Sequence, residues 1–214
     1  MSAHPRNRPL LALLASLAYS GALAQDVPGC GNLSNAFGPY DYRDPKLRNE
    51  LSLVEVHHFT PQVEQLVRGQ SSAEPLSDIV YTLRAFPNHH RALNSIGRFE
   101  LGGGKILSGQ IPSADCYFRR AVAFRPEDQQ VRLLYGIFLS RKGDADAALE
   151  QYEAALEIAP ESPEVNYNAA LYFLDRGDLA RAKQLADVAY AAGYPLPGLR
   201  DRIAAAEARA ARNQ

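Results

Sequence analysis

The sequence predicts an all-α protein in which pairs of helices stack side by side into a solenoid. Three similar segments end at a proline or a Tyr-Pro pair, and the ends at Pro126, Pro160 and Tyr194 follow one another at a fixed interval of 34 residues. Glycines expected at the turns, Gly143 and Gly177, recur at the same interval. A repeat of this length is typical of stacked helical hairpins, each built from two helices of about a dozen residues.

Small residues recur at the same interval and fit the geometry of a hairpin. Gly136 and Ala170 are 34 residues apart on the expected first helices, where a small side chain lets the second helix approach closely. Ala148 and Ala182 repeat the pattern on the second helices. Pro160 ends its helix, because proline has no backbone N–H with which to continue the ladder of hydrogen bonds. The pattern therefore predicts both helices of each hairpin and the face on which they meet.

One stretch carries the most specific pattern, in which a small residue is followed by an alanine, an aromatic residue, a second alanine and a proline. These residues are Gly136, Ala148, Tyr152, Ala155 and Pro160. The pattern resembles the tetratricopeptide repeat family, and the resemblance covers about residues 88–196. It is weaker in the last copy, where Ala186 takes the place of the usual aromatic residue. The resemblance implies a scaffold for protein–protein interactions and no enzyme activity.

The expected organisation places helical hairpins in the middle of the chain and different segments at both ends. We expect an extended segment rich in aromatic residues, glycine and proline at 25–59, a degenerate hairpin at 60–87, an irregular repeat at 88–128, regular repeats at 129–162 and 163–196, and a capping helix at 197–214. Residues 25–59 show no helical period. The irregular repeat carries a five-residue insert in a glycine-rich turn, which is typical of a loop.

Residues 1–24 have the pattern of a signal peptide. Arg6 and Arg8 precede an apolar run, and the segment Ala22-Leu23-Ala24 fits the small-residue rule for cleavage before Gln25. The run is too short for a comfortable membrane span, so we expect a periplasmic protein with no stable span after cleavage. An uncleaved anchor is the alternative. The whole chain also resembles a group of exported repeat proteins of Gram-negative bacteria.

The two cysteines, Cys30 and Cys116, are expected to form a disulfide bond. Both lie in the part that follows the signal peptide, and two cysteines in an exported protein suggest one bond in an oxidising compartment. Ala114, Phe118 and Ala121 define the buried stripe of the helix that carries Cys116. At 100° per residue, Cys116 points roughly opposite that stripe, so we expect it to face outward and to need a partner.

The resemblance implies that a partner binds in a concave groove lined by the first helix of each hairpin. Counted from the small residue, the expected groove residues are Arg91, Asn94, Arg98, Leu134, Ile137, Arg141, Tyr167, Asn168 and Leu171. An apolar part of the partner is expected to meet Leu134, Ile137, Tyr167 and Leu171, and an acidic end to meet Arg91 and Arg98. The alternative is that the apolar residues of this face only pack neighbouring helices together.

Composition and motifs exclude several other functions. The net charge of −1 does not suggest a broad basic surface for nucleic acid. The Gly102–Lys105 stretch lacks the glycine and hydroxyl positions of a phosphate-binding loop, and no nucleophile or zinc-peptidase motif is present. We therefore expect no enzyme activity and no cofactor. The partner is expected to be another envelope protein or a peptide segment.

A competing interpretation is a periplasmic sensor of metal or a small ligand. It would use two pairs of adjacent histidines, His57-His58 and His89-His90. Adjacent residues on a helix point about 100° apart, and no pair has the i, i+4 spacing of a zinc site. The expected role of these histidines is therefore at the surface and at helix starts, with no metal bound.

Overall fold

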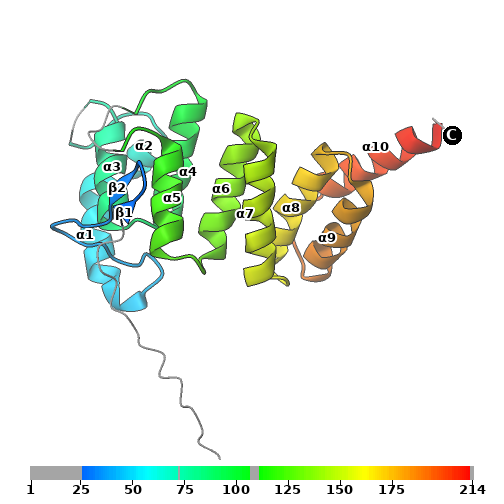
Figure 1. Cartoon of the computed structure of the whole chain (residues 1–214), viewed down its shortest axis with the longest axis horizontal. Helices are drawn as coiled ribbons and strands as arrows, with labels where there is room; N and C mark the ends of the chain where they lie inside the picture. Colours follow the sequence, from blue (N-terminus) through cyan, green and yellow to red (C-terminus); the bar gives the residue numbers. More distant parts are fainter. Residues whose placement is uncertain (1–25, 72, 107–110, 213–214) are drawn as a thin grey trace, which may run out of the picture.

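The structure is a computed structural model that describes residues 26–71, 73–106 and 111–212. The described helices form an elongated row that runs from α1 at one end to α10 at the other (Figure 1). This arrangement confirms the all-α solenoid of hairpins that the sequence predicts. The expected signal peptide, residues 1–24, lies outside the described residues. None of the described helices is long and apolar enough to cross a lipid bilayer.

Two hairpins match the predicted regular repeats. The first consists of α6 (Gln129–Lys142) and α7 (Ala145–Ile158), and the second of α8 (Pro163–Asp175) and α9 (Leu179–Ala191). Each of these helices starts after a residue whose side chain accepts a hydrogen bond from the first turn: Asp128, Asp144, Ser162 and Asp178. The turns pass through Gly143 and Gly177 at φ of 85° and 84°, a left-handed conformation that glycine adopts without a steric cost.

The two helices of a hairpin approach closely where the sequence has a small residue. A Cβ atom placed on Gly136 would lie 3.2 Å from the ring of Tyr152 on the second helix. A Cβ on Gly97 would lie 3.5 Å from the ring of Phe118 and 3.3 Å from that of Phe138 on the next hairpin. The predicted role of these small residues is therefore confirmed, and their partners are aromatic rings rather than backbone.

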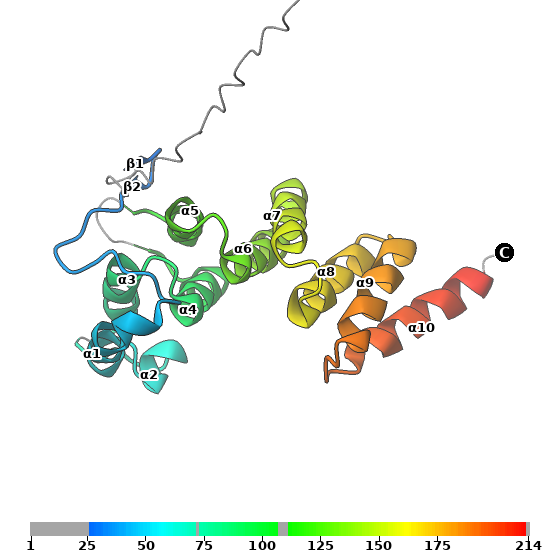
Figure 2. The same ribbon diagram turned by 90° about the horizontal axis from the view of Figure 1, so that it is seen from below.

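The irregular repeat and the capping helix also form as predicted. The repeat consists of α4 (His90–Leu101) and α5 (Ala114–Phe124), joined by the longer connection, and Ser113 caps α5. The capping helix α10 (Gly198–Arg212) buries Leu199 and Ile203 against the last hairpin. Figure 2 shows α4, α6 and α8 following one another along one side of the solenoid, with α5 and α7 on the other side. This order places the first helices of the three repeats on a common face.

The N-terminal part differs from the prediction. Residues 45–58, expected to be extended, form a 3-10 turn (Pro45–Leu47) and the helix α1 (Arg48–His58). The hairpin expected at 60–87 is absent as such, because α2 (Pro61–Glu64) is a single turn and α3 (Leu76–Ala85) packs against α1. The apolar residues of α1 do not all lie on one buried face, because Leu53 and Val56 are 54% and 60% exposed. The sequence of α1 therefore shows only a weak helical period.

Residues 26–44 do lie extended on the helices, as predicted. Two short strands, β1 (Asp26–Val27) and β2 (Gly31–Asn32), pair antiparallel beside α5. The Cys30–Cys116 disulfide joins this hairpin to α5 and confirms the predicted pairing. Cys116 is only 4% exposed, so the expectation that it faces outward is wrong. It does lie opposite the stripe of Ala114, but the strand segment covers that face.

The disulfide closes a loop between residues 86 positions apart, which gives a prediction for stability. Replacing both cysteines by serine should lower the free energy of unfolding by about 3–4 kcal/mol, because the unfolded chain regains the entropy that the cross-link removes. Urea denaturation of the oxidised parent and the double variant measures the difference. Thiol labelling of the denatured, unreduced parent should find no free thiol, and two reactive thiols per chain would contradict the bond.

Candidate partner-binding groove

The first helices of the repeats bring part of the predicted site together. Asn94 and Arg98 of α4 and Leu134, Ile137 and Arg141 of α6 line one cleft between the two helices. The rings of Phe118 and Phe138 form part of its lining. The enclosed space is only about 10 Å³, roughly enough for one water molecule. This part of the groove is therefore a surface on which a chain segment can lie, and it is too small to enclose a ligand molecule.

The groove continues onto α8, but Tyr167, the aromatic residue predicted to line it there, is not accessible. Asn168 and Leu171 are half-buried on α8. Tyr167, in contrast, is 7% exposed and stacks on the ring of Tyr194 at 4.3 Å between centroids. It belongs to the small core that α10 completes with Leu199. The prediction that Tyr167 is a central partner contact is therefore corrected, because the end of the chain covers it.

The two arginines expected to receive an acidic end are engaged within the chain. Arg91 Nε donates to Glu64 Oε1 at 2.9 Å, and Arg91 Nη1 donates to Glu55 Oε1 at 3.2 Å. Arg98 donates to the backbone carbonyl of Glu64. The hydrogen bond from Arg91 is the main reason that the pKa of Glu64 is lowered. Sequence spacing placed these arginines on the correct face, but it gave no sign that α2 lies on them.

Arg141 has a different environment from Arg91. It is exposed at the edge of the cleft and forms no ion pair with another described residue. Its neighbour Lys142, in contrast, pairs with Glu100 at 2.9 Å. The part of the groove that remains open therefore has an apolar floor, with Leu134 and Ile137, and at its rim a positive charge that no described carboxylate pairs with.

The histidine pairs do not converge on one site. His58 Nδ1 lies 2.9 Å from Asp78, His89 Nε2 lies 3.1 Å from Glu55, and His90 Nε2 lies 2.9 Å from Asp128. Each histidine thus meets a different carboxylate. Within the part of the chain that the structure describes, no group of three or more histidine, cysteine, aspartate or glutamate side chains is placed to hold a metal ion.

His89 has a structural role that the sequence suggested only in part. It is fully buried and caps α4, because its Nδ1 accepts a hydrogen bond from the N–H of Ala92 at 3.1 Å. Its Nε2–H therefore donates to Glu55, and the ring lies between Tyr42 and Phe59. Burial lowers the pKa of His89, which favours this neutral form. His57 and His58, expected near a helix start, are instead the last residues of α1.

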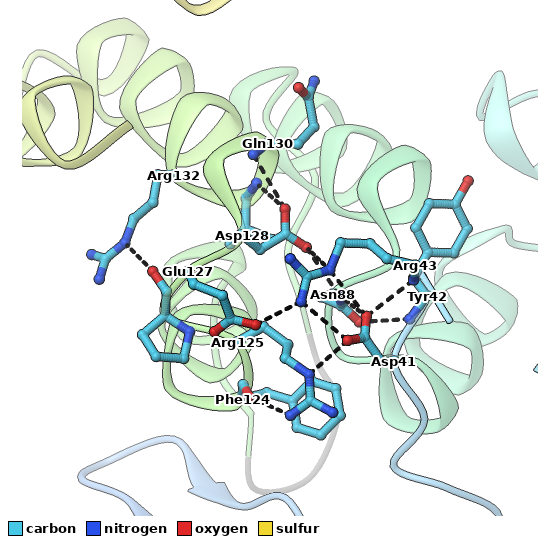
Figure 3. A network of polar contacts seen from close by, with 12 residues as sticks. Asp41, Tyr42, Arg43, Asn88, Phe124, Arg125, Glu127, Asp128, Gln130 and Arg132 are labelled. Atoms are coloured by element: carbon cyan, nitrogen blue, oxygen red, sulfur yellow. Dashed lines mark hydrogen bonds and ion pairs between the residues drawn. The ribbon is translucent and has the colours of Figure 1, made fainter. Parts of the chain in front are cut away.

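A polar network that the sequence analysis missed ties the extended segment to the repeats (Figure 3). Asn88 donates to Asp41 at 2.7 Å and to Asp128 at 3.0 Å, and Arg125 donates to Asp41 at 2.7 Å. Arg43 pairs with both aspartates. Burial opposes the charge of Asp41, but these hydrogen bonds outweigh burial and hold its pKa well below the usual range. The network has a structural role, because the carboxylates of Asp41 and Asp128 already accept hydrogen bonds from side chains of this chain.

Asp128 joins this network to the first regular repeat. Its Oδ1 caps α6 by accepting from the N–H groups of Gln130 and Val131 at 3.2 and 3.3 Å. Burial opposes its charge, but hydrogen bonds from His90 and Asn88 outweigh it and lower the pKa of Asp128. The capping role of Asp128 could have been predicted from the sequence. An aspartate that stands two residues after Pro126 and just before an expected helix is a common helix cap.

The lowered pKa of Asp128 predicts an acid-dependent contribution to stability. Its charged form should stabilise the fold above the unfolded value of about 3.9, and this contribution should be lost as the pH falls through the lower folded value. Asp128→Asn should therefore cost about 1–3 kcal/mol at neutral pH and less at about pH 3. Urea denaturation at both pH values measures this. Asp201→Asn on the exposed face of α10 is the control, and an equal cost for Asp128→Asn at both pH values would contradict the assignment.

Comparison with known proteins agrees with this geometry. The family model described as tetratricopeptide repeat matches residues 108–163 and 139–197, which include α5 to α9. The chain is also similar to the probable biofilm formation methyltransferase WspC of Pseudomonas putida, with 31% identity over 122 residues. That match covers 56% of this chain but 29% of WspC, so the chain spans less than a third of that protein's length. The stacked hairpins and the matched repeats together show that residues 108–197 are built of tetratricopeptide repeats.

Proposed function

We propose that the protein is an exported adaptor that binds another protein of the cell envelope through the open part of its groove. Tetratricopeptide repeats are scaffolds for protein–protein interactions in general, and this supports the adaptor role. The signal-peptide pattern of residues 1–24 supports export, and the Cys30–Cys116 bond suits an oxidising compartment. The proposed location is the periplasm.

A non-catalytic role is also part of the proposal. WspC is named a methyltransferase, but the match covers 29% of that protein, so its activity does not transfer to this chain. His58, His89 and His90 each contact a carboxylate within the fold, namely Asp78, Glu55 and Asp128. The groove itself offers apolar side chains, an amide and a guanidinium, which suit recognition of a chain segment rather than bond cleavage.

One observation carries the proposal: apolar side chains remain partly exposed in the middle of the face formed by the first helices. Leu134, Ile137 and Leu171 are all half-buried there, whereas the ends of the same face are covered by α2 and by the packing around Tyr167. A partner segment with an apolar centre would bury these three side chains further. The hydrophobic gain is roughly proportional to the apolar area removed from water.

The charge at the rim suggests the polarity of the partner segment. Arg141 stands beside the apolar floor and forms no ion pair with a described residue. Arg98 donates to the backbone carbonyl of Glu64 and forms no ion pair within the described part of the chain either. An acidic residue next to the apolar centre of the partner would therefore meet Arg141 and Arg98. Arg91, which helical spacing places on the same face, already pairs with Glu55 and Glu64, so the acidic residue of the partner is not expected there. Such rim charges mainly increase the rate of association.

The groove proposal is tested by substituting its floor. Ile137→Gln should weaken capture of the partner by about 1–3 kcal/mol, because it places a polar group at the buried centre of the interface. The matched control is Leu149→Gln, which makes a similar change at a residue of α7 that is 36% exposed. Immobilised parent and variants are incubated with envelope extract, and bound proteins are quantified by mass spectrometry. Thermal melting verifies that both variants remain folded.

If Ile137→Gln recovers every protein as well as Leu149→Gln does, the groove is not the binding surface. A folded Arg141→Glu variant adds a kinetic readout once a partner is purified. Its association should be slower than that of the parent and less dependent on salt. An unchanged association rate would remove Arg141 from the site while leaving the apolar floor in place.

Export is tested separately from binding. The protein isolated from the periplasmic fraction should have the intact mass of a chain that begins at Gln25, because the Ala22-Leu23-Ala24 segment ends the apolar run. A mass that retains residues 1–24, or recovery of the protein only from the cytoplasm, would contradict the proposed location. Neither result would affect the groove experiment.

A further inference from the structure

The short helix α2 lies on the groove side of α4. It comprises residues Pro61–Glu64 and contacts α3 and α4, and Figure 2 shows it beside α4 on the side away from α5. Val63 is fully buried in the main core, so this turn is docked by an apolar side chain as well as by polar contacts. The segment therefore occupies the N-terminal end of the face that α6 and α8 continue.

Glu64 is held by three residues of the groove face of α4. Arg91 donates two hydrogen bonds to its carboxylate, one of them at 2.9 Å, in a forked arrangement. Ser95 Oγ donates to the backbone carbonyl of Glu64 at 2.9 Å, and Arg98 donates to the same carbonyl. These three residues have the spacing i, i+4, i+7 and so share one helix face.

The backbone contact explains why a helical turn suits this face. The last carbonyl groups of a helix have no partner within the helix and need donors from elsewhere. Glu64 is the last residue of α2, and Ser95 and Arg98 supply those donors. The face thus recognises two features together: a carboxylate side chain and the free carbonyl end of a helical turn, next to a buried aliphatic residue.

A disfavoured backbone conformation stands two residues after the end of α2. Leu66 has a φ of 62°, in the left-handed region where a side chain with a Cβ atom is disfavoured. The connection from Phe59 to Leu66 therefore holds α2 in place at a conformational cost. A separate segment with the same contacts would bind without that cost.

We propose that the Arg91, Ser95 and Arg98 face is a binding site for a helical turn of a partner protein that ends in an aliphatic residue followed by glutamate, and that α2 is its built-in competitor. The inference rests on the proposed function, because it extends the partner-binding groove from α6 along α4. A tethered occupant has an effective concentration in the millimolar range for a short flexible link. The partner displaces it by adding contacts to the open floor at Leu134 and Ile137.

The probe is a fluorescent peptide with the sequence of residues 59–67, titrated into the full exported chain and followed by anisotropy. Glu64→Gln weakens the internal competitor, because it removes the charge that Arg91 binds. This variant should bind the peptide about tenfold more tightly than the parent, as expected for loss of a charge-assisted hydrogen bond by the competitor. Glu161→Gln makes the same change at an exposed residue outside the groove and should bind like the parent.

Two further measurements locate the peptide. A peptide with glutamine in place of its glutamate should bind the Glu64→Gln variant about tenfold more weakly, and Arg98→Gln in the Glu64→Gln background should weaken the original peptide. Hydrogen exchange should become faster at residues 60–69 in Glu64→Gln and remain unchanged at residues 129–191. Equal peptide affinity of parent and Glu64→Gln, or indifference to either of the two substitutions, overturns the inference.

The outcomes separate this inference from the proposed function. The peptide covers only the site on α4, so Ile137→Gln should leave its affinity unchanged while reducing capture of the envelope partner. If capture depends on Ile137 but the peptide does not respond to Glu64→Gln, only the competitor inference fails and α2 is a fixed wall of the groove. If the peptide responds as expected but capture does not depend on Ile137, the proposed groove function fails instead.

Discussion

The architecture depends on the close approach of two helices at a residue that has little or no side chain. At Gly136 the ring of Tyr152 occupies the space where a side chain would stand, and at Gly97 the rings of Phe118 and Phe138 do so. Protein interiors are packed as densely as organic crystals, so such a contact fixes the distance between the helices within narrow limits. Repeating it along the chain places the first helices in one row and thereby creates a common face for α4, α6 and α8.

The same constraint explains which parts of the fold the sequence predicts. The contact of Gly136 with Tyr152 lies within one hairpin. The small residue at this position recurs 34 residues later as Ala170, so the close approach of the two helices leaves a periodic signal in a single sequence. The helix α1 has no such signal. It buries Val54 but leaves Leu53 and Val56 exposed, and its neighbours α3 and the 41–44 segment are not related to it by any repeat. A helix whose packing contacts occur only once in the chain leaves no repeating pattern in the sequence from which it could be predicted.

The candidate site shows the same limit at the level of single residues. Helical spacing correctly places Arg91, Asn94 and Arg98 on one face of α4, because that depends only on the local geometry of the helix. Whether another segment covers that face depends on contacts between distant residues. Glu64 reaches Arg91 across 27 positions. Tyr194, which follows α9, stacks on Tyr167 of α8. Position on a helix is therefore predictable from sequence, and accessibility is not.

Capping and binding compete for the same surface in a solenoid. Each end of the stack would expose an apolar face unless a further element covered it, and repeat proteins need such caps to remain soluble. Here α2 and α3 with α1 cover one end, and α10 covers the other by burying Leu199 beside Tyr167. Both caps also take up groove positions, so the accessible apolar floor shortens to the region around Leu134, Ile137 and Leu171.

A short contact of this kind gives a limited affinity by itself, because association must first offset the lost freedom of both partners. Strong binding by this protein therefore requires either an additional contact, such as the site under α2, or several weak contacts that act together.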